Sequence, residues 1–235
     1  TETGEKNLLV SEYITGYTSG QVAHSGQVVI KFAQLVVDEE QLGTAPDERA
    51  IELSPAVDGQ AAWTGVSTLA FSPAGRLDWG TEYTVKLNLE KIYGEDVGVK
   101  DYSFTVFTPE KDFSVELRGL KMKEDDNTHY SLSGQVNTSD EFDNEEVADM
   151  ISASQSGTGL TIAWEHRPAA RKHIFTLDDI ERKETQDEVV IKWDGRKADV
   201  DRKGEKSVTV PSMKDFGILS SRVISSPAQY LEIEF

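Results

Sequence analysis

Few side chains in this sequence could carry out chemistry, and none has the spacing of a known catalytic motif. The 235 residues include no cysteine, which excludes disulfides, thiolate metal sites, cysteine nucleophiles and thioesters within this chain. There is no G-x-S-x-G nucleophile elbow and no H-E-x-x-H zinc motif. Segment 202–207 contains Gly, Lys and Ser but lacks the G-x-x-x-x-G-K spacing that surrounds a phosphate. We therefore predict no catalytic residue, no cofactor and no enzymatic activity.

Two histidines are the first candidates for a metal site. His166 and His173 flank segment 167–172, which is typical of a hairpin loop between two strands. If the hairpin closes, the two imidazoles could approach each other and bind a metal ion. The loop also carries several cations, which would repel a divalent ion. We favour a surface hairpin with two solvated histidines, and we predict no metal ligand.

Two acidic runs could offer hard oxygen ligands to calcium. They are segments 124–127 and 140–146, and neither matches the D-x-[DN]-x-[DN]-G calcium loop with its glutamate at the twelfth position. Segment 124–127 is more typical of a hairpin turn. Segment 139–146 begins with capping residues and places acids in a first turn, which favours a short helix before Val147 and Ile151. We expect solvated loops at both places.

The four tryptophans could form a platform for sugar stacking. Trp164 and Trp193 end alternating segments, which favours packing at the edge of a core. Trp63 and Trp79 flank turns, so they are the better candidates for exposed aromatic contacts. Paired carboxylates of a glycoside hydrolase cannot be identified among 42 acidic residues.

The elements that must position these residues are strands, because almost every apolar segment alternates with period two. About seven short strands in the first half predict an antiparallel sandwich. Segment 38–48 is polar and acidic, which indicates a loop with at most one helical turn. The residues predicted to form the first core are Val28, Ile30, Phe32, Phe71, Tyr83, Val85, Leu87, Phe104 and Val106.

A second series of alternating segments follows a short polar joint at 107–112. We place the domain boundary there, with one domain at 1–110 and another at 111–235. Further short helical turns are expected near 139–151 and 176–183. The predicted fold class is all-β, with two tandem antiparallel Ig-like or macroglobulin-like β-sandwiches and short helical insertions in the second.

The net charge of the chain argues against two classes of partner, nucleic acids and anionic membranes. The formal net charge is −18, and acids exceed bases in both predicted domains. Such a chain would repel a nucleic acid or an anionic membrane surface. No apolar run is long enough to span a bilayer, and the polar opening 1–7 lacks the pattern of a secretory leader.

The first half resembles the bacterial Ig-like module of surface proteins. The resemblance rests on segments 26–32, 51–59, 69–73 and 77–87, where Gly80-Thr81 makes a tight turn before the strand that Tyr83 begins. With the acidic N-terminus and a longer second sandwich, nearly the whole chain is similar to the N-terminal region of bacterial alpha-2-macroglobulins. The second-half residues that carry this likeness are Gly195, Gly204-Glu205, Val208-x-Val210-Pro211 and Phe216.

This resemblance implies a non-catalytic scaffold fragment of a large endopeptidase inhibitor in the bacterial cell envelope, either the periplasm or the cell surface. In Gram-negative members this region follows a lipoprotein signal, so Thr1 would lie just after a lipidated cysteine that anchors the protein to the membrane. Proteases would meet the full-length protein, and this region would contact neighbouring domains. The family's bait region and Cys-Gly-x-x-Glu-Gln thioester are absent from this chain, so no functional residue is carried over. A stand-alone adhesion or carbohydrate-binding surface module is the alternative.

The last residues resemble the opening strand of the first module. With a one-residue offset, Leu231, Ile233 and Phe235 fall on Val28, Ile30 and Phe32. This match predicts that residues 229–235 are the first strand of a further Ig-like module. The alternative is that they close the second sandwich.

Overall fold

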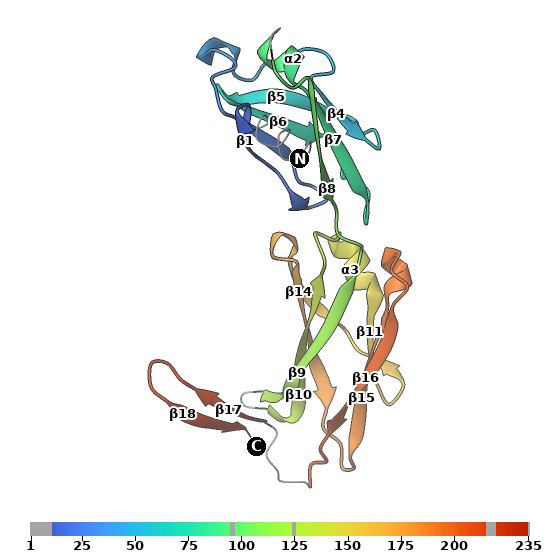
Figure 1. The fold of residues 1–235 in the computed structure, drawn as a ribbon. Coiled ribbons are helices and arrows are strands. Elements are labelled where there is room, and N and C mark those ends of the chain that lie inside the picture. The colour runs from blue at the N-terminus through green and yellow to red at the C-terminus, as the bar shows by residue number, and fades with distance from the viewer. Residues whose placement is uncertain (1–10, 95–96, 124–125, 215–219, 235) are drawn as a thin grey trace, which may run out of the picture. The chain divides into compact units, whose positions relative to one another are not determined.

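A computed structural model describes residues 11–94, 97–123, 126–214 and 220–234, in antiparallel sheets with only short helices between them (Figure 1). This confirms the all-β fold class. By its internal contacts the chain divides into two compact units, Thr1–Glu110 and Lys111–Phe235. We call them unit 1 and unit 2 and describe each by itself. None of the described helices is long and apolar enough to cross a membrane.

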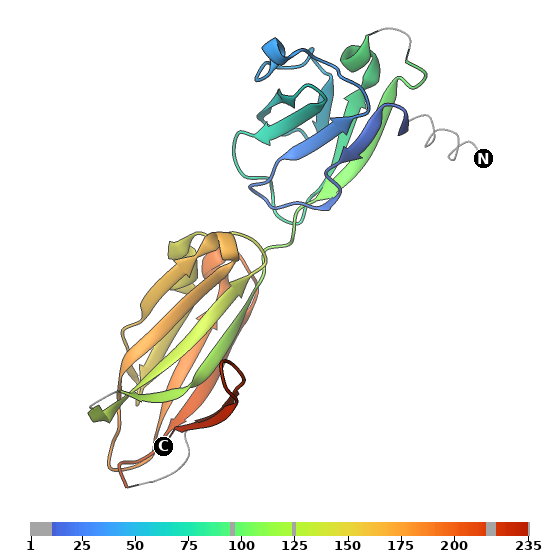
Figure 2. The same cartoon turned by 90° about the vertical axis from the view of Figure 1, so that its left-hand side faces the viewer.

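Unit 1 consists of two four-stranded sheets (Figure 2). One has the order β1(Ile14–Tyr17)-β3(Val28–Phe32)-β6(Thr68–Pro73)-β5(Gly59–Gly65). The other has the order β2(Gly20–Gln21)-β8(Asp101–Phe107)-β7(Glu82–Asn88)-β4(Ile51–Ser54). All pairs are antiparallel except β2 with β8, which is parallel.

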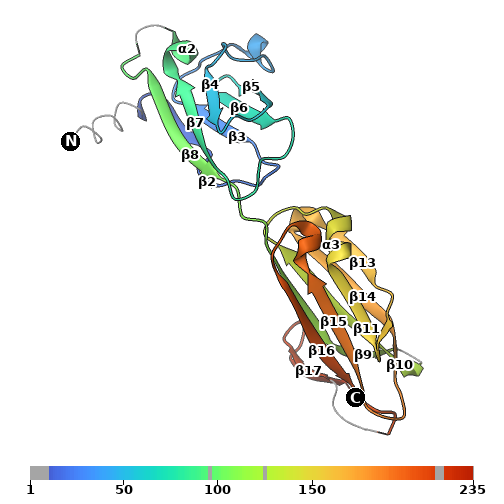
Figure 3. The ribbon, with the colours of Figure 1, turned by 90° about the vertical axis from the view of Figure 1, so that its right-hand side faces the viewer.

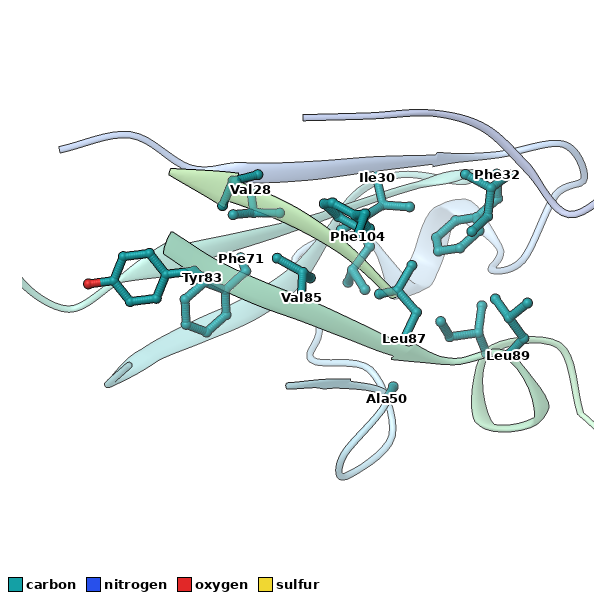
Figure 4. Packing of buried hydrophobic residues seen from close by; sticks show 14 of the residues in the cluster. Val28, Ile30, Phe32, Ala50, Phe71, Tyr83, Val85, Leu87, Leu89 and Phe104 are labelled. Atoms are coloured by element: carbon teal, nitrogen blue, oxygen red, sulfur yellow. The ribbon is translucent and has the colours of Figure 1, made fainter. Parts of the chain in front are cut away.

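The core of unit 1 lies between these sheets, where the alternating side chains meet (Figure 4). In β7 the buried positions are Tyr83, Val85 and Leu87, and the residues between them are exposed. All nine predicted core residues are buried, so that prediction is confirmed. Burial of this apolar surface is the main favourable contribution to folding.

Unit 1 also contains a helix that the sequence pattern had hidden. The period-two alternation extends to Leu89, but β7 ends at Asn88 and α2(Leu89–Tyr93) follows. The Asn88 side chain accepts a hydrogen bond from the backbone N–H of Lys91 at 3.0 Å, which caps the helix. Leu89 therefore reaches the core from a helix. In loop 38–48, one 3-10 turn, η1(Glu39–Gln41), forms as expected.

Unit 2 also contains two four-stranded sheets, seen as two layers in Figure 3. The first has the order β13(Ala163–Arg167)-β14(Lys172–Glu181)-β10(Asp126–Thr138)-β9(Phe113–Lys123). The second has the order β12(Thr158–Gly159)-β11(Ile151–Gln155)-β15(Asp187–Asp194)-β16(Lys203–Val210). Short helical segments connect them: α3(Asn144–Met150), η2(Pro168–Ala170) and η3(Gly195–Ala198).

One of the two helical turns expected in unit 2 is confirmed and the other is wrong. Helix α3 lies within segment 139–151 and buries Val147. Segment 176–183 is instead extended, and β14 continues through it to Glu181. A register shift in its pairing with β10 places Leu177 and Ile180, three residues apart, in buried positions. A β-bulge of this kind imitates the spacing of a helix.

The remaining strands form a separate hairpin. Within residues 220–234, β17(Ser220–Ile224) pairs antiparallel with β18(Tyr230–Glu234), and neither strand joins a sheet of the sandwich (Figure 1). In its described part this segment therefore adds no strand to either four-stranded sheet of unit 2. Phe235 lies outside the described residues.

Candidate functional site

Trp63, one of the two aromatic residues expected on the surface, belongs to the core. It is 4% exposed, and its ring packs against Phe32 with 5.7 Å between centroids. The expectation of exposure was wrong because Trp63 lies on the inward face of β5, opposite the buried Leu69 of β6. Residues 43–44 pair with the backbone of β5 at the same position. The backbone N–H of Trp63 donates to the carbonyl of Thr44 at 3.0 Å, and its carbonyl accepts from the N–H of Gly43 at 2.8 Å.

Trp79, the second such residue, is half-buried. Its ring lies against His24, with 4.1 Å between centroids, and His24 is itself buried. Part of the indole therefore remains accessible. Because Trp63 is internal, the two residues do not form a common aromatic surface.

Trp164 and Trp193 lie at the core edge of unit 2, as predicted, and each is half-buried. The Trp164 ring stacks on His166 with an interplanar angle of 11°. Trp193 lies over Gly204, its cross-strand partner, and a Cβ at residue 204 would come within 2.6 Å of the indole. Glycine is required there for the indole to approach the backbone.

A hollow of about 630 Å³ opens beside Trp193. Met150 and Gly204 also line it, together with charged side chains that include Lys197 and Lys203. An indole next to mixed polar groups can stack on a sugar ring or another flat apolar face. The hollow thus gives unit 2 an accessible aromatic surface.

The two histidines of hairpin β13–β14 form a pair in which His173 is buried and His166 is half-buried. They occupy facing positions in the register, and their Nδ1 atoms are 2.8 Å apart. His173 is 0% exposed, so the expectation of two solvated histidines was wrong. The reason is the alternation of β14, in which His173 shares the inward face with Phe175 and Leu177.

The electrostatics of this pair favour neutral imidazoles. Burial, and then the nearby His166, lower the pKa of His173 to about 4. Burial also lowers the pKa of His166. At neutral pH one Nδ1–H donates to the other Nδ1, so both atoms are occupied by their mutual hydrogen bond. In the described parts of the chain, no group of three or more His, Cys, Asp or Glu side chains could hold a metal ion.

A third cluster was not found from the sequence, and it contains a serine beside a lysine. Lys183 Nζ lies 2.7 Å from Ser156 Oγ and 2.6 Å from Asp187 Oδ2. Ser156 Oγ also donates to both Asp187 oxygens, at 2.9 and 2.7 Å. Serine within hydrogen-bond distance of an amine is the arrangement of Ser–Lys nucleophile pairs.

The charges in this cluster argue against a nucleophile. The contact with Lys183, and then that with Ser156, hold the pKa of Asp187 well below its usual range. Lys183 Nζ donates to Ser156 Oγ, so the serine hydroxyl directs its own proton at the Asp187 carboxylate and not at the lysine. A carboxylate with so low a pKa is a weak base for that proton. The cluster therefore acts as a structural tie.

The elements that this tie joins are the β11–β12 turn and the segment between β14 and β15. Ser156 and Gly157 have φ of 49° and 80°, as the two central residues of a type I′ hairpin turn require. Gln155 extends the tie, since its side chain donates to Asp187 at 3.1 Å and to the Glu181 carbonyl at 2.7 Å. The Ser-Gly dipeptide signals the turn, but no sequence pattern links it to Lys183 and Asp187.

The remaining candidate segments have local structural partners. Asp126 accepts hydrogen bonds from the side chain and backbone of Thr128, which lower its pKa to about 2. Glu124 and Asp125 lie outside the described residues. In segment 202–207, Arg202 donates to the Phe113 carbonyl at 3.0 Å and the following residues extend along β16. The backbone of that segment therefore does not curve around a phosphate.

No family model matches this chain, and no curated protein matches it. Among solved structures, L,D-transpeptidase 3 from Mycobacterium tuberculosis in complex with a faropenem-derived adduct has a TM-score of 0.28 at 14% identity, over 52% of this chain and 45% of that one. An L,D-transpeptidase from Mycobacterium smegmatis has a TM-score of 0.29 at 9% identity, over 95% and 76%. The collagen adhesin of S. aureus has a TM-score of 0.17 at 9% identity, over 95% of each chain. The chain spans about half the length of the first of these structures.

Proposed function

We propose that this chain is a non-catalytic scaffold region of a large cell-envelope endopeptidase inhibitor similar to alpha-2-macroglobulin. The resemblance of segments 26–32 and 51–87 to the bacterial Ig-like module supports the family. The arrangement of unit 2 supports the absence of catalysis, because its reactive side chains are held in structural hydrogen bonds. The intact protein would meet its target proteases through other regions, and a lipid anchor upstream of Thr1 would hold it at the membrane.

The observation that carries the non-catalytic part of this proposal is the Ser156–Lys183–Asp187 cluster. It is the arrangement in the described chain most similar to a nucleophile with its base, but the serine hydroxyl directs its proton at the weakly basic carboxylate of Asp187. In the His166–His173 pair, each Nδ1 is occupied by the other, and His173 Nε2 is buried where no substrate reaches it. A general base needs a free lone pair directed at the proton that it removes.

The isolated chain should therefore neither hydrolyse substrates nor inhibit proteases. The measurement is a panel of ester, peptide and glycoside substrates, together with casein digestion by several unrelated endopeptidases in the presence of the chain. Ser156→Ala provides the control for trace activity, because the serine hydroxyl is the only nucleophile in the cluster. Substrate turnover by the chain that Ser156→Ala abolishes would contradict the proposal. So would dose-dependent protection of casein by the isolated chain.

The hollow beside Trp193 favours a second candidate function, a surface adhesion or carbohydrate-binding module. Burial of Trp63 removes one of the two residues that first suggested it. The test is binding of soluble polysaccharides to the chain and to Trp193→Ala, with Trp164→Ala as the matched control. Saturable binding lost only in Trp193→Ala would favour the carbohydrate-binding function, and no binding to any variant would remove it.

A further inference from the structure

The hairpin β17–β18 has one apolar face and one charged face. Because directly paired residues lie on the same side of an antiparallel ladder, the pairs Ser221–Ile233 and Val223–Leu231 share one face. The pairs Arg222–Glu232 and Ile224–Tyr230 lie on the other face, where Arg222 and Glu232 form an ion pair. The hairpin is therefore built to be covered on one side and solvated on the other.

The apolar face is uncovered in this chain. Val223 is 60% exposed, Leu231 58% and Ile233 40%. Strand β17 approaches β9, and residues of both line a hollow of about 530 Å³. An isolated two-stranded hairpin is marginally stable in water and needs further strands or another layer. The alternation of β18 is typical of a strand with one buried face, yet these side chains are exposed.

Unit 1 shows what covers such a hairpin. There β1 pairs antiparallel with β3, with Tyr17 opposite Ile30 and Gly16 opposite Lys31. Under the sequence match of Ile233 with Ile30, Ser221 and Ser220 occupy the positions of Tyr17 and Gly16. The match thus extends from one strand to a pair of strands in the same register. From Ser221 to Ile233 the chain is one residue shorter than from Tyr17 to Ile30. The loop between the strands is shorter still, 225–229 against 18–27, and the longer one contains β2.

In unit 1 the apolar face of β3 is fully covered. Val28 and Ile30 lie opposite Phe71 and Leu69 of the neighbouring strand β6. Figure 4 shows the side chains of Val28 and Ile30 on β3 within the same packed cluster as Val85 of the second sheet. The counterparts in β18 are Leu231 and Ile233. There β18 pairs with β17 along one edge, and no described strand pairs with its other edge.

We propose that β17–β18 is the opening hairpin of a third β-sandwich of the unit 1 type, completed by residues that follow Phe235 in the intact protein. The covering surface is a strand equivalent to β6 and a sheet equivalent to β7–β8. The module therefore begins at Ser220, nine residues before the strand that the sequence match identified. A second copy of this chain is the weaker occupant, because two chains of net charge −18 repel each other.

Hydrogen–deuterium exchange tests this proposal on two lengths of the natural protein. In the 235-residue chain, the amides of 220–234 should exchange almost as fast as an unstructured peptide, while those of β10 and β14 stay protected. The second chain is extended by the roughly 100 residues that follow in the reading frame, a typical size for one domain. In it, the protection of the amides of 220–234 should rise at least about 100-fold. Val223→Ser with Leu231→Ser should abolish this gain. The matched pair on the charged face, Arg222→Ser with Glu232→Ser, should keep most of it.

Four results would overturn the inference. One is strong protection of 220–234 in the 235-residue chain, which would assign the hairpin to unit 2. Another is a dimer of that chain, detected by light scattering and lost in the Val223→Ser, Leu231→Ser variant, which would make a second copy the occupant. The others are an extended chain in which the hairpin stays unprotected, and a reading frame that ends shortly after Phe235.

The inference deepens the proposed scaffold function but is tested separately from it. If the extended chain protects the hairpin and the intact protein leaves proteases unaffected, the third module stands and the protease-inhibitor function fails.

Discussion

At the scale of single residues, burial decides which polar side chains keep their ordinary pKa. His173 lies on the inward face of β14, and burial lowers its pKa to about 4, against an ordinary value near 6.5. The folded protein therefore holds this imidazole neutral over a pH range in which the unfolded chain binds a proton. That difference makes the stability of unit 2 depend on pH.

His173→Leu should remove this pH dependence. In the wild-type chain the contribution of His173 is complete above pH 6.5 and is lost as the pH falls towards 4, because the unfolded state takes up the proton. Between pH 7.5 and 4.5 this residue should account for about 2 kcal/mol of lost stability. Urea unfolding at pH 7.5 and at pH 4.5, followed through exchange-labelled peptides of β14, measures this loss of stability. His129→Gln, at a half-buried position outside the pair, should keep the wild-type slope, and an unchanged slope in His173→Leu would contradict the assignment.

Asp187→Asn should destabilise unit 2 through the loss of the tie to Lys183. The substitution removes the charge while keeping the shape, and hydrogen bonds to charged groups contribute about 1.5–3 kcal/mol. We expect a loss in the lower part of that range by urea unfolding. Asp194→Asn is the matched control, because the Asp194–Arg196 pair is exposed and should contribute little. Equal effects of the two substitutions would show that the cluster around Ser156 is not a tie.

At the scale of elements, a glycine in the first sheet of unit 2 allows a neighbouring side chain to pack directly against the backbone. Gly134 lies in β10 between β9 and β14, where an added Cβ would come within 2.3 Å of the Phe175 ring and 2.8 Å of the Glu116 carbonyl. A side chain at this position would force two strands apart. The alternation of β10 puts Gly134 on the inward face with Leu132 and Val136, so the ring of Phe175 fills the space that a side chain would take.

Gly134→Ala should lower the stability of unit 2 by about 1–3 kcal/mol, as overpacking of a well-packed core does. Gly159→Ala is the control within the same unit, since no atom lies within 4 Å of its added Cβ. Thermal unfolding of both variants gives the comparison. A Gly134→Ala variant as stable as Gly159→Ala would mean that Phe175 does not pack over this glycine.

Period-two alternation predicts strands well and their interruptions poorly. Strands such as β3 and β7 were predictable because each buried position follows the last by two residues. The end of β7 was not, because Leu89 continues the alternation while Asn88 caps a helix. The extended form of 178–181 was hidden by the bulge between Tyr130 and Leu132, which depends on the partner strand. Local patterns do not contain such tertiary information.

The candidate sites show the same division between local and tertiary information. Pairing of His166 with His173 followed from the expected hairpin, but the burial of His173 depends on a whole sandwich. Burial of Trp63 depends on packing against Phe32, a residue of another strand. The Ser156–Lys183–Asp187 tie joins three separate positions that no motif relates.

At the scale of the whole molecule, each unit has its own core. A substitution in one core should therefore lower the stability of that unit and leave the other unit almost unchanged. Phe71→Ala truncates a buried ring between β3 and β5 and should reduce the stability of unit 1 by about 3–5 kcal/mol. Denaturant titration of the full chain, with hydrogen exchange to assign each transition, measures the effect. Unit 2 amides serve as the internal control. A loss below about 1 kcal/mol would mean that the ring contributes little to the core.

The proposed role of the whole molecule is to support a protease trap without acting on proteases itself. A trap that encloses a protease blocks large protein substrates but leaves the active site open to small peptides. The scaffold region alone encloses nothing, because it has neither a bait segment nor a thioester. The intact protein and this chain should therefore differ in one ratio, the rate of casein cleavage relative to the rate of small-peptide cleavage.

That ratio, measured for several unrelated endopeptidases with each protein in turn, tests the central claim most directly. We predict that the intact protein lowers the ratio strongly while small-peptide cleavage continues, and that residues 1–235 alone leave it unchanged. An intact protein that leaves the ratio at its starting value for every protease would contradict the account, and so would a 235-residue chain that lowers it.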